Sequence, residues 1–256
     1  MGRMLGMAGH DPLPLRKALD AFFPGGSDGK GTKQDSPAPY DGWGVSGFSA
    51  GRAVYFERRA EWAAGGRDLL DVAVGRAERA KTPVIVAHLR QSTGESRDVA
   101  NTQPFHYRDW VFAHEGGILN AADLALQDAQ PQGKTDSERF MLWLVEKMIP
   151  DLDPAARFVE AIQEARSRLN YTSFNLMISD GQTLWAYREA GDAKLENGET
   201  LSDREKKCGL HVASLAGSAL VCSEPLKAAA KTWTALPSKT LAVISVQQPK
   251  PRMVAV

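Results

Sequence analysis

The sequence predicts an α+β fold in which helices are layered outside a pair of β-sheets. The order of elements along the 256-residue chain carries this prediction. Strand-like segments come first, two long helical segments occupy the middle, and strand-like segments return towards the carboxyl end. No internal repeat and no long linker interrupts this order, so we expect one domain over residues 1–256.

The first forty residues contain a strand, a short helix and a loop. Apolar residues that alternate with small ones predict a strand starting at residue 2, at a glycine. Residues 12–23 start with proline and place apolar residues at helical spacing, which predicts a short helix. Residues 24–39 hold Gly, Pro, Ser and charged residues without a large apolar side chain, so a flexible loop and candidate lid is expected there.

The next segments alternate between strand and helix. The strand-like runs are residues 43–49, 53–59, 82–91 and 110–118, and residues 67–80 have helical period. The run 82–91 is continuously apolar, which is typical of a buried strand. The run 110–118 enters a Gly-Gly turn at residues 116–117.

Two consecutive helices are predicted over residues 137–149 and 153–170, and we expect them to be neighbours. The second begins with an Asp-Pro pair, a favoured helix start, and carries one apolar face formed by Phe158, Ile162, Ala165 and Leu169. From residue 173 onward every segment is predicted to be strand, including 209–223 and 240–247. Asp180-Gly181 lies between two apolar alternations and predicts a hairpin.

Charge and composition exclude several classes of partner. Lys plus Arg equal Asp plus Glu at 31 each, so no net charge attracts nucleic acid or anionic lipid. No segment approaches the roughly 20 apolar residues of a membrane helix, and the apolar stretch after Arg3 is too short for a signal peptide. A cytoplasmic protein is expected. Cys208 and Cys222 are expected to be reduced thiols rather than a disulfide, and neither a metal site nor a cofactor is predicted.

Four short stretches are distinctive together, in their order and spacing: DGWG at 41–44, AHLRQST at 87–93, FAHEGG at 112–117 and KTDSE at 134–138. They follow a first strand of the form Met-x-Arg-x-Leu-Gly and precede a SEPL…W…LP pattern. This set resembles the class II glutamine amidotransferases of the amino-terminal-nucleophile hydrolase superfamily. The likeness is closest to small stand-alone members that cleave γ-glutamyl amides in ergothioneine and glutathione metabolism.

The resemblance implies a four-layer αββα sandwich that binds glutamine or a γ-glutamyl amide. In such proteins the thiol of an amino-terminal Cys attacks the amide and the α-amino group acts as base. The resemblance assigns Arg90 to the substrate α-carboxylate, with the Thr93 hydroxyl beside it, and Asp136 to the α-ammonium. It also places His114, Gln103 and Trp43 at substrate-binding positions.

Each of these residues has a structural alternative. Arg90 follows a buried strand, where a salt bridge is common, and Asp136 lies at a favourable helix start. His88 and His114 lie within apolar strands, where a histidine buried in the core is the competing interpretation.

Three positions depart from the family pattern. Gly2 occupies the place of the nucleophile and has no side chain. The oxyanion-hole sequence His-Asn-Gly reads His114-Glu115-Gly116, which replaces an amide donor with a carboxyl group. The turn Asn-x-His-Pro carries Gln103 in place of histidine.

These departures leave three hypotheses. In the first hypothesis, the chain is an amidotransferase or γ-glutamyl amide hydrolase in which residue 2 was changed by engineering. In the second, it belongs to a natural lineage that gave up amide hydrolysis. The clustering of three departures favours the natural lineage. Such a pseudoenzyme would sense an amino acid or dock a partner enzyme. In a third hypothesis, Glu115 acts as a general base in an unrelated reaction.

Overall fold

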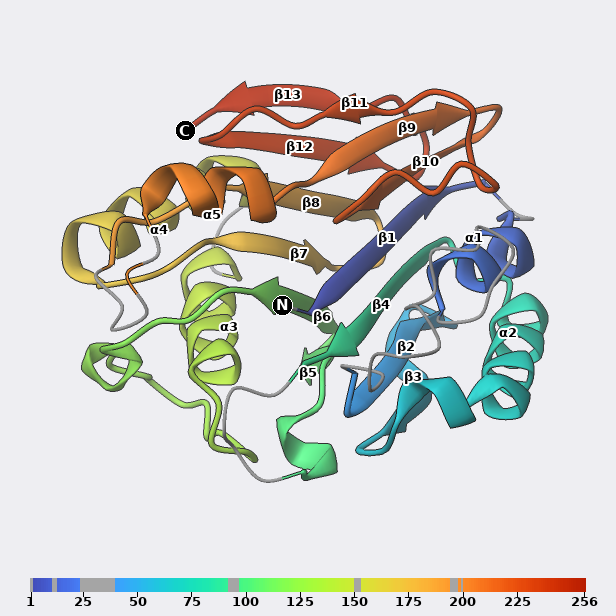
Figure 1. Cartoon of the computed structure of the whole chain (residues 1–256), viewed down its shortest axis with the longest axis horizontal. Helices are drawn as coiled ribbons and strands as arrows, with labels where there is room; N and C mark the ends of the chain where they lie inside the picture. The colour runs from blue at the N-terminus through green and yellow to red at the C-terminus, as the bar shows by residue number, and fades with distance from the viewer. Residues whose placement is uncertain are drawn as a thin grey trace.

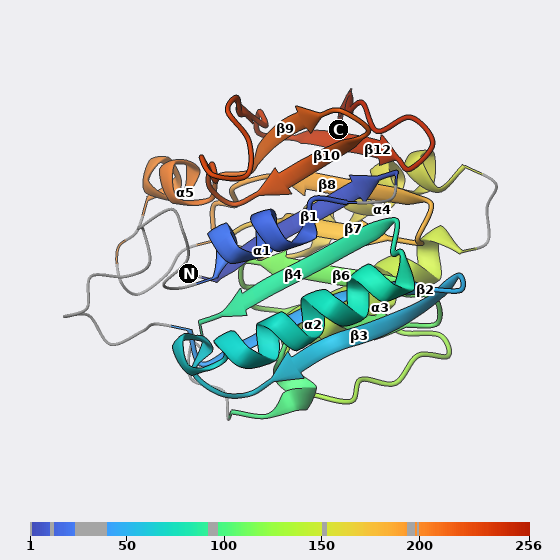
Figure 2. The ribbon, with the colours of Figure 1, turned by 90° about the vertical axis from the view of Figure 1, so that its right-hand side faces the viewer.

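Two antiparallel sheets pack face to face between two pairs of helices, as Figures 1 and 2 show. The computed structural model describes residues 2–10, 13–23, 40–91, 97–149, 153–193, 198 and 200–256. One apolar cluster fills the space between the sheets. A second lies between the seven-stranded sheet and its helices, and a third lies between the six-stranded sheet and its helices. The predicted four-layer αββα sandwich is confirmed.

The seven-stranded sheet has the order β11-β9-β10-β1-β4-β2-β3, with every neighbouring pair antiparallel. Its strands are β1 (Arg3–Gly9), β2 (Gly42–Ser49), β3 (Arg52–Arg59), β4 (Val84–Arg90), β9 (His211–Leu215), β10 (Ser218–Cys222) and β11 (Thr234–Ala235). The first strand of the chain is thus the central strand of this sheet.

The six-stranded sheet has the order β13-β12-β8-β7-β6-β5. Its strands are β5 (Phe105–Tyr107), β6 (Trp110–Glu115), β7 (Asn175–Ser179), β8 (Thr183–Arg188), β12 (Thr240–Ser245) and β13 (Arg252–Ala255). The predicted hairpin joins β7 to β8. Its turn has Gly181 at φ +88°, a conformation that favours glycine. The Asp180 carboxylate accepts hydrogen bonds from the backbone N–H groups of Gln182 and Thr183, both at 2.9 Å.

Helices α1 (Leu15–Phe22) and α2 (Arg67–Ala80) cover the outer face of the seven-stranded sheet. Helices α3 (Asp136–Met148) and α4 (Pro154–Arg168) cover the outer face of the six-stranded sheet. The expected contact between α3 and α4 is confirmed, with shared core residues and an ion pair of 2.8 Å between Lys147 Nζ and Glu164 Oε2. Short 3₁₀ turns occupy Ala63–Gly65, Val99–Asn101 and Ala121–Asp123.

The expectation of strands only after residue 173 is wrong, because α5 (Leu201–Lys207) is a helix. A capping box starts it: the Thr200 hydroxyl accepts from the Asp203 backbone N–H, and the Asp203 carboxylate accepts from the Thr200 backbone N–H. A seven-residue helix is too short to display an apolar period, so the capping pair is its sequence signal.

Other expectations need smaller corrections or lie outside the described residues. The helix predicted to start at residue 12 starts at Leu15. The candidate lid, 24–39, lies outside the described residues. Cys208 and Cys222 are both buried and are not joined by a disulfide, as expected. Among the helices that the structure describes, none is long and apolar enough to cross a membrane.

Strand alternation decides which residues of β1 face the second sheet. Leu5 and Met7 belong to the apolar cluster under α1 and α2, whereas Met4 and Ala8 belong to the cluster between the sheets. Residue 2 continues the even-numbered series, so this position lies on the side that faces the six-stranded sheet.

Candidate functional site

Gly2 lies at the start of the central strand, beside β4. Arg3 pairs with Leu89 and Met4 with His88, so the same register puts Gly2 opposite Arg90. A Cβ atom at Gly2 would lie 2.8 Å from the carbonyl oxygen of Leu89 and 3.1 Å from His88 Nε2. Gly2 has no side chain, and adding one here requires its neighbours to shift.

His88 lies on the inter-sheet face of β4 and is 3% exposed. Burial, helped by the nearby His114 and Arg90, lowers its pKa to about 3, so the imidazole is neutral at physiological pH. Its Nδ1 atom has no hydrogen-bond partner among the described residues.

Glu115 ends strand β6 and points between the sheets, where it is 4% exposed. Its Oε2 atom accepts a hydrogen bond of 2.9 Å from the Ser223 hydroxyl, and that hydroxyl oxygen also accepts from the Met4 backbone N–H at 2.8 Å. The Oε1 atom of Glu115 has no partner within the described part of the chain. Ser223 thus ties this carboxyl group to the central strand.

Burial raises the pKa of Glu115 to about 8, although the Ser223 hydrogen bond and the positive charges of the α-amino group and Arg3 oppose this shift. The carboxyl group is therefore largely protonated near neutral pH. An acid with this pKa can accept or release a proton under physiological conditions.

Asn175 begins β7 directly opposite Glu115 in the antiparallel register. It is 0% exposed, and neither its Oδ1 nor its Nδ2 atom has a partner among the described residues. We call His88, Glu115 and Asn175 the inter-sheet cluster. Sequence reasoning missed Asn175 and Ser223. A lone Asn within the apolar run of β7 was the available signal for the first, and the SEPL pattern was the signal for the second.

Arg90 forms a buried ion pair of 3.1 Å between its Nη1 atom and Asp41 Oδ2. Asp41 comes from the DGWG stretch, and Gly42 of the same stretch pairs with Arg90 across the β2–β4 ladder. Glycine at Gly2 and at Gly42 leaves no side chain on either side of Arg90. Both the salt-bridge interpretation and the ligand interpretation of Arg90 thus retain a physical basis.

Asp136 is the first residue of α3, behind a Thr135 cap. One carboxylate oxygen accepts from the Ile118 backbone N–H at 2.5 Å, and the other accepts from the Ser137 backbone N–H at 2.8 Å. A Cβ atom at Gly117 would lie 4.0 Å from Asp136 Oδ2. Asp136 therefore fastens the turn after Glu115 to α3. A carboxylate has lone pairs for further donors, so these bonds leave capacity for an ammonium group.

His114 and Gln103 hold strand β6 in place. The His114 imidazole contacts the carbonyl oxygen of Ser173 through Nε2 at 3.0 Å and the Ser137 hydroxyl through Nδ1 at 2.9 Å. Because a carbonyl only accepts, Nε2 carries the proton. The Gln103 side chain donates to the backbone carbonyl of His114 at 3.0 Å and accepts from its N–H at 2.6 Å. Through these bonds the two residues fix the backbone next to Glu115.

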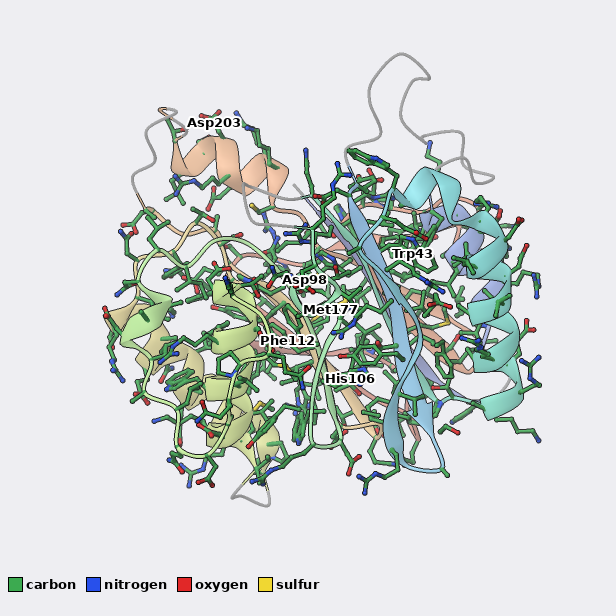
Figure 3. All side chains as sticks on the ribbon, turned by 90° about the horizontal axis from the view of Figure 1, so that it is seen from below. Trp43, Asp98, His106, Phe112, Met177 and Asp203 are labelled. Atoms are coloured by element: carbon green, nitrogen blue, oxygen red, sulfur yellow. The ribbon has the colours of Figure 1, made fainter. Side chains whose placement is uncertain are left out.

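The structure does not bring Trp43 to this cluster. Its indole is 0% exposed and lies edge-on against Phe23, with ring centroids 5.0 Å apart, in the core under α1 and α2. Figure 3 shows Trp43 on the side of the sheet that faces α2, away from Met177 and Phe112. Thr93 lies outside the described residues.

Gly116 is exposed at the turn that follows Glu115. Its φ of +153° and the Ser173 carbonyl oxygen, which would lie 2.2 Å from a Cβ atom, require glycine there. Within the described residues, no group of three or more His, Cys, Asp and Glu side chains is placed to hold a metal ion.

Replacing Glu115 with glutamine is expected to flatten the pH dependence of stability. The pKa of Glu115 is raised from 4.5 to about 8 on folding, so the folded state binds more protons than the unfolded state between these values. The Glu115 contribution to stability should therefore fall as pH rises through this window, by up to about 1.4 kcal/mol per pH unit, whereas His88, whose pKa falls on folding, contributes a rise in stability below about pH 6.5. Guanidinium unfolding from pH 7 to pH 8.5, above the histidine window, measures the Glu115 slope. E224Q, which removes a neighbouring carboxylate, should keep the wild-type slope, and an equally steep slope in E115Q would contradict the prediction.

Comparison with known proteins supplies the family. The family model for class II glutamine amidotransferases matches residues 1–251. A Haemophilus influenzae protein that carries a glutamine amidotransferase name is 30% identical over 155 residues, which is 57% of this chain and 51% of that protein. YafJ of Escherichia coli K12, named in the same way, is 31% identical over 116 residues, which is 42% of this chain and 46% of YafJ. The chain thus spans about half the length of the curated relatives it matches.

Solved structures support the same fold. A glutamine aminotransferase class-II domain protein from Silicibacter pomeroyi superposes with a TM-score of 0.62 at 22% identity, over 99% of this chain and 100% of that one. Glutamine phosphoribosylpyrophosphate amidotransferase from Bacillus subtilis superposes with a TM-score of 0.63 at 14% identity, over 99% of this chain and 49% of that one. With the family model covering nearly every residue, the chain belongs to the class II glutamine amidotransferases.

Proposed function

We propose that this chain is a pseudoenzyme of the cytoplasm that binds glutamine or a γ-glutamyl compound without hydrolysing it. The observation that carries the proposal is that Arg90 and Asp136 of the family pattern are present, whereas the reacting groups of that pattern are not. Position 2 has no side chain, and position 115 holds a carboxyl group in place of the amide donor, one that loses its donor proton as pH rises through about 8. Amide hydrolysis in this family needs both groups.

The positions of the retained residues support an amino-acid ligand. Arg90 lies two residues after His88 on the same face of β4, a separation of about 7 Å along a strand. Asp136 contacts the turn that directly follows Glu115. A guanidinium group and a carboxylate therefore border the inter-sheet cluster and are suited to the α-carboxylate and α-ammonium of one amino acid. A partner enzyme would then bind the ligand-bound and ligand-free forms of this chain with different affinity.

Thermal unfolding in the presence of glutamine, glutamate and a γ-glutamyl dipeptide tests this proposal. A ligand at 100 times its dissociation constant should add about 2.7 kcal/mol to the free energy of unfolding. Arg90→Lys keeps the charge but loses the bidentate fork, so it should weaken the effect at least tenfold in ligand concentration. Arg58→Lys, a change on the outer strand β3, is the matched control and should behave as wild type. The absence of any shift in the wild-type chain would overturn ligand binding.

A further inference from the structure

The inter-sheet cluster presents four polar atoms without partners in the described structure: Glu115 Oε1, Asn175 Oδ1, Asn175 Nδ2 and His88 Nδ1. All three side chains are at least 96% buried. Leaving a buried donor or acceptor unpaired is unfavourable, and native proteins pair the great majority of such atoms. A polar group from outside the chain is the natural partner for this set.

The inventory of these atoms matches a primary carboxamide. A carboxamide offers one oxygen that accepts and two N–H groups that donate. The Asn175 Nδ2 group can donate to that oxygen, while Glu115 Oε1 and Asn175 Oδ1 can accept the two N–H groups. Glu115 and Asn175 lie directly opposite each other on the same sheet face, where paired side chains have Cβ atoms about 5 Å apart. One amide group can therefore reach both residues.

We infer that Glu115 and Asn175 receive the side-chain amide of the bound amino acid, and that Glu115 rejects a side-chain carboxylate whenever Glu115 is ionised. This inference rests on the proposed function and adds a rule for ligand choice. An amide can pair with Glu115 in either protonation state, because its oxygen accepts from the protonated carboxyl group and its N–H donates to the ionised carboxylate. A carboxylate can only accept, so it needs the proton of Glu115, and two ionised carboxylates at this distance repel each other.

The groups around Glu115 do not remove the dependence of ligand choice on the ionisation of Glu115. Ser223 donates to the other oxygen, Oε2, and leaves Oε1 unpaired. Arg3 of β1 is the cation among the described neighbours, but it forms an ion pair with Glu224 and donates to the Phe22 carbonyl. The remaining titratable neighbours are the α-amino group, whose positive charge favours ionised Glu115, together with Tyr40 before β2, His88 on β4 and Cys222 on β10. Burial lowers the pKa of His88 and raises those of Tyr40 and Cys222, so these three side chains are neutral at pH 7.

Competitive calorimetry from pH 6.5 to pH 9.5 with glutamine, glutamate and norvaline tests the inference. The measured quantity is the Kd for glutamate divided by the Kd for glutamine, in which the shared titration of the ligand α-ammonium cancels. In the wild-type chain this ratio should be flat below about pH 7 and rise by up to about tenfold per pH unit above the Glu115 pKa of about 8. Norvaline, which keeps the α-groups but ends in a methyl group, should bind at least tenfold more weakly than glutamine.

Two variants separate Glu115 from its surroundings. Glu115→Gln is isosteric and uncharged, so its ratio should not change with pH. Glu224→Gln removes the other nearby carboxylate and should keep the wild-type slope. A flat wild-type ratio, a slope that persists in E115Q, or norvaline binding as tightly as glutamine would each overturn the inference alone. Failure of all three amino acids to bind would overturn the proposed function, and this inference with it.

Discussion

The double variant G2C/E115N is expected to release ammonia from glutamine at least about a hundredfold faster than G2C alone. The reason is that a thiol at residue 2 supplies the nucleophile, whereas asparagine at residue 115 supplies the N–H donor that stabilises the oxyanion. Loss of one such donor typically lowers kcat by about 10²–10³-fold, equivalent to about 2.7–4 kcal/mol. The wild-type chain, with neither group, should show no turnover. A coupled glutamate assay on purified protein measures all three rates.

The controls for this experiment follow from the geometry at Gly2. A Cβ atom there lies 2.8 Å from the Leu89 carbonyl, so G2A/E115N reports the steric cost of any side chain without providing a thiol. Intact mass establishes that the initiating methionine has been removed, since the mechanism needs a free α-amino group beside the thiol. If G2C/E115N melts like G2A/E115N and still releases no ammonia, Q103H is added to restore the third departure. If this triple variant also releases no ammonia, the result would contradict the family chemistry at residue 2. Rapid release of ammonia by the wild-type chain would contradict the pseudoenzyme proposal.

The second large effect is expected from Trp43, and it is an effect on stability. Truncating this fully buried indole to alanine should lower the free energy of unfolding by about 3–5 kcal/mol, because a cavity forms between α2, Phe23 and the sheet. Equilibrium unfolding in guanidinium measures the loss. W43F, which keeps an aromatic ring, should lose less and should retain the stabilisation by glutamine. If W43F abolished glutamine binding at unchanged stability, Trp43 would contact the ligand after all.

Local sequence signals predicted most elements of this fold because their causes are local. Asp153 and Pro154 start α4, Asp180-Gly181 makes the hairpin, and the continuous apolar run of β4 reflects burial on both faces. The exceptions are α5, which depends on a two-residue capping box rather than on an apolar period, and β5, which has three residues and was not predicted.

The site was predicted only in part, because proximity between distant strands is not a local property. The family resemblance proposed Gly2, Arg90, Glu115 and Asp136 as site residues. The same motif logic placed Trp43 with the substrate, yet strand alternation turns residue 43 to the face opposite residues 42 and 44. Which of those faces meets the second sheet is set by the packing of the two sheets. Asn175 was missed for the same reason, since only the β6–β7 register puts it opposite Glu115.

By itself, the sequence determined that residue 2 carries no side chain to attack an amide, that a carboxyl group replaces an amide at residue 115, and that strands flank two central helices. These are properties of residue identity and short-range pattern. Only the tertiary structure decided that Glu115 is buried with one oxygen unpaired beside Asn175, and that burial raises its pKa to about 8. Desolvation and missing hydrogen-bond partners arise when two sheets close over a group, which no linear stretch of residues specifies.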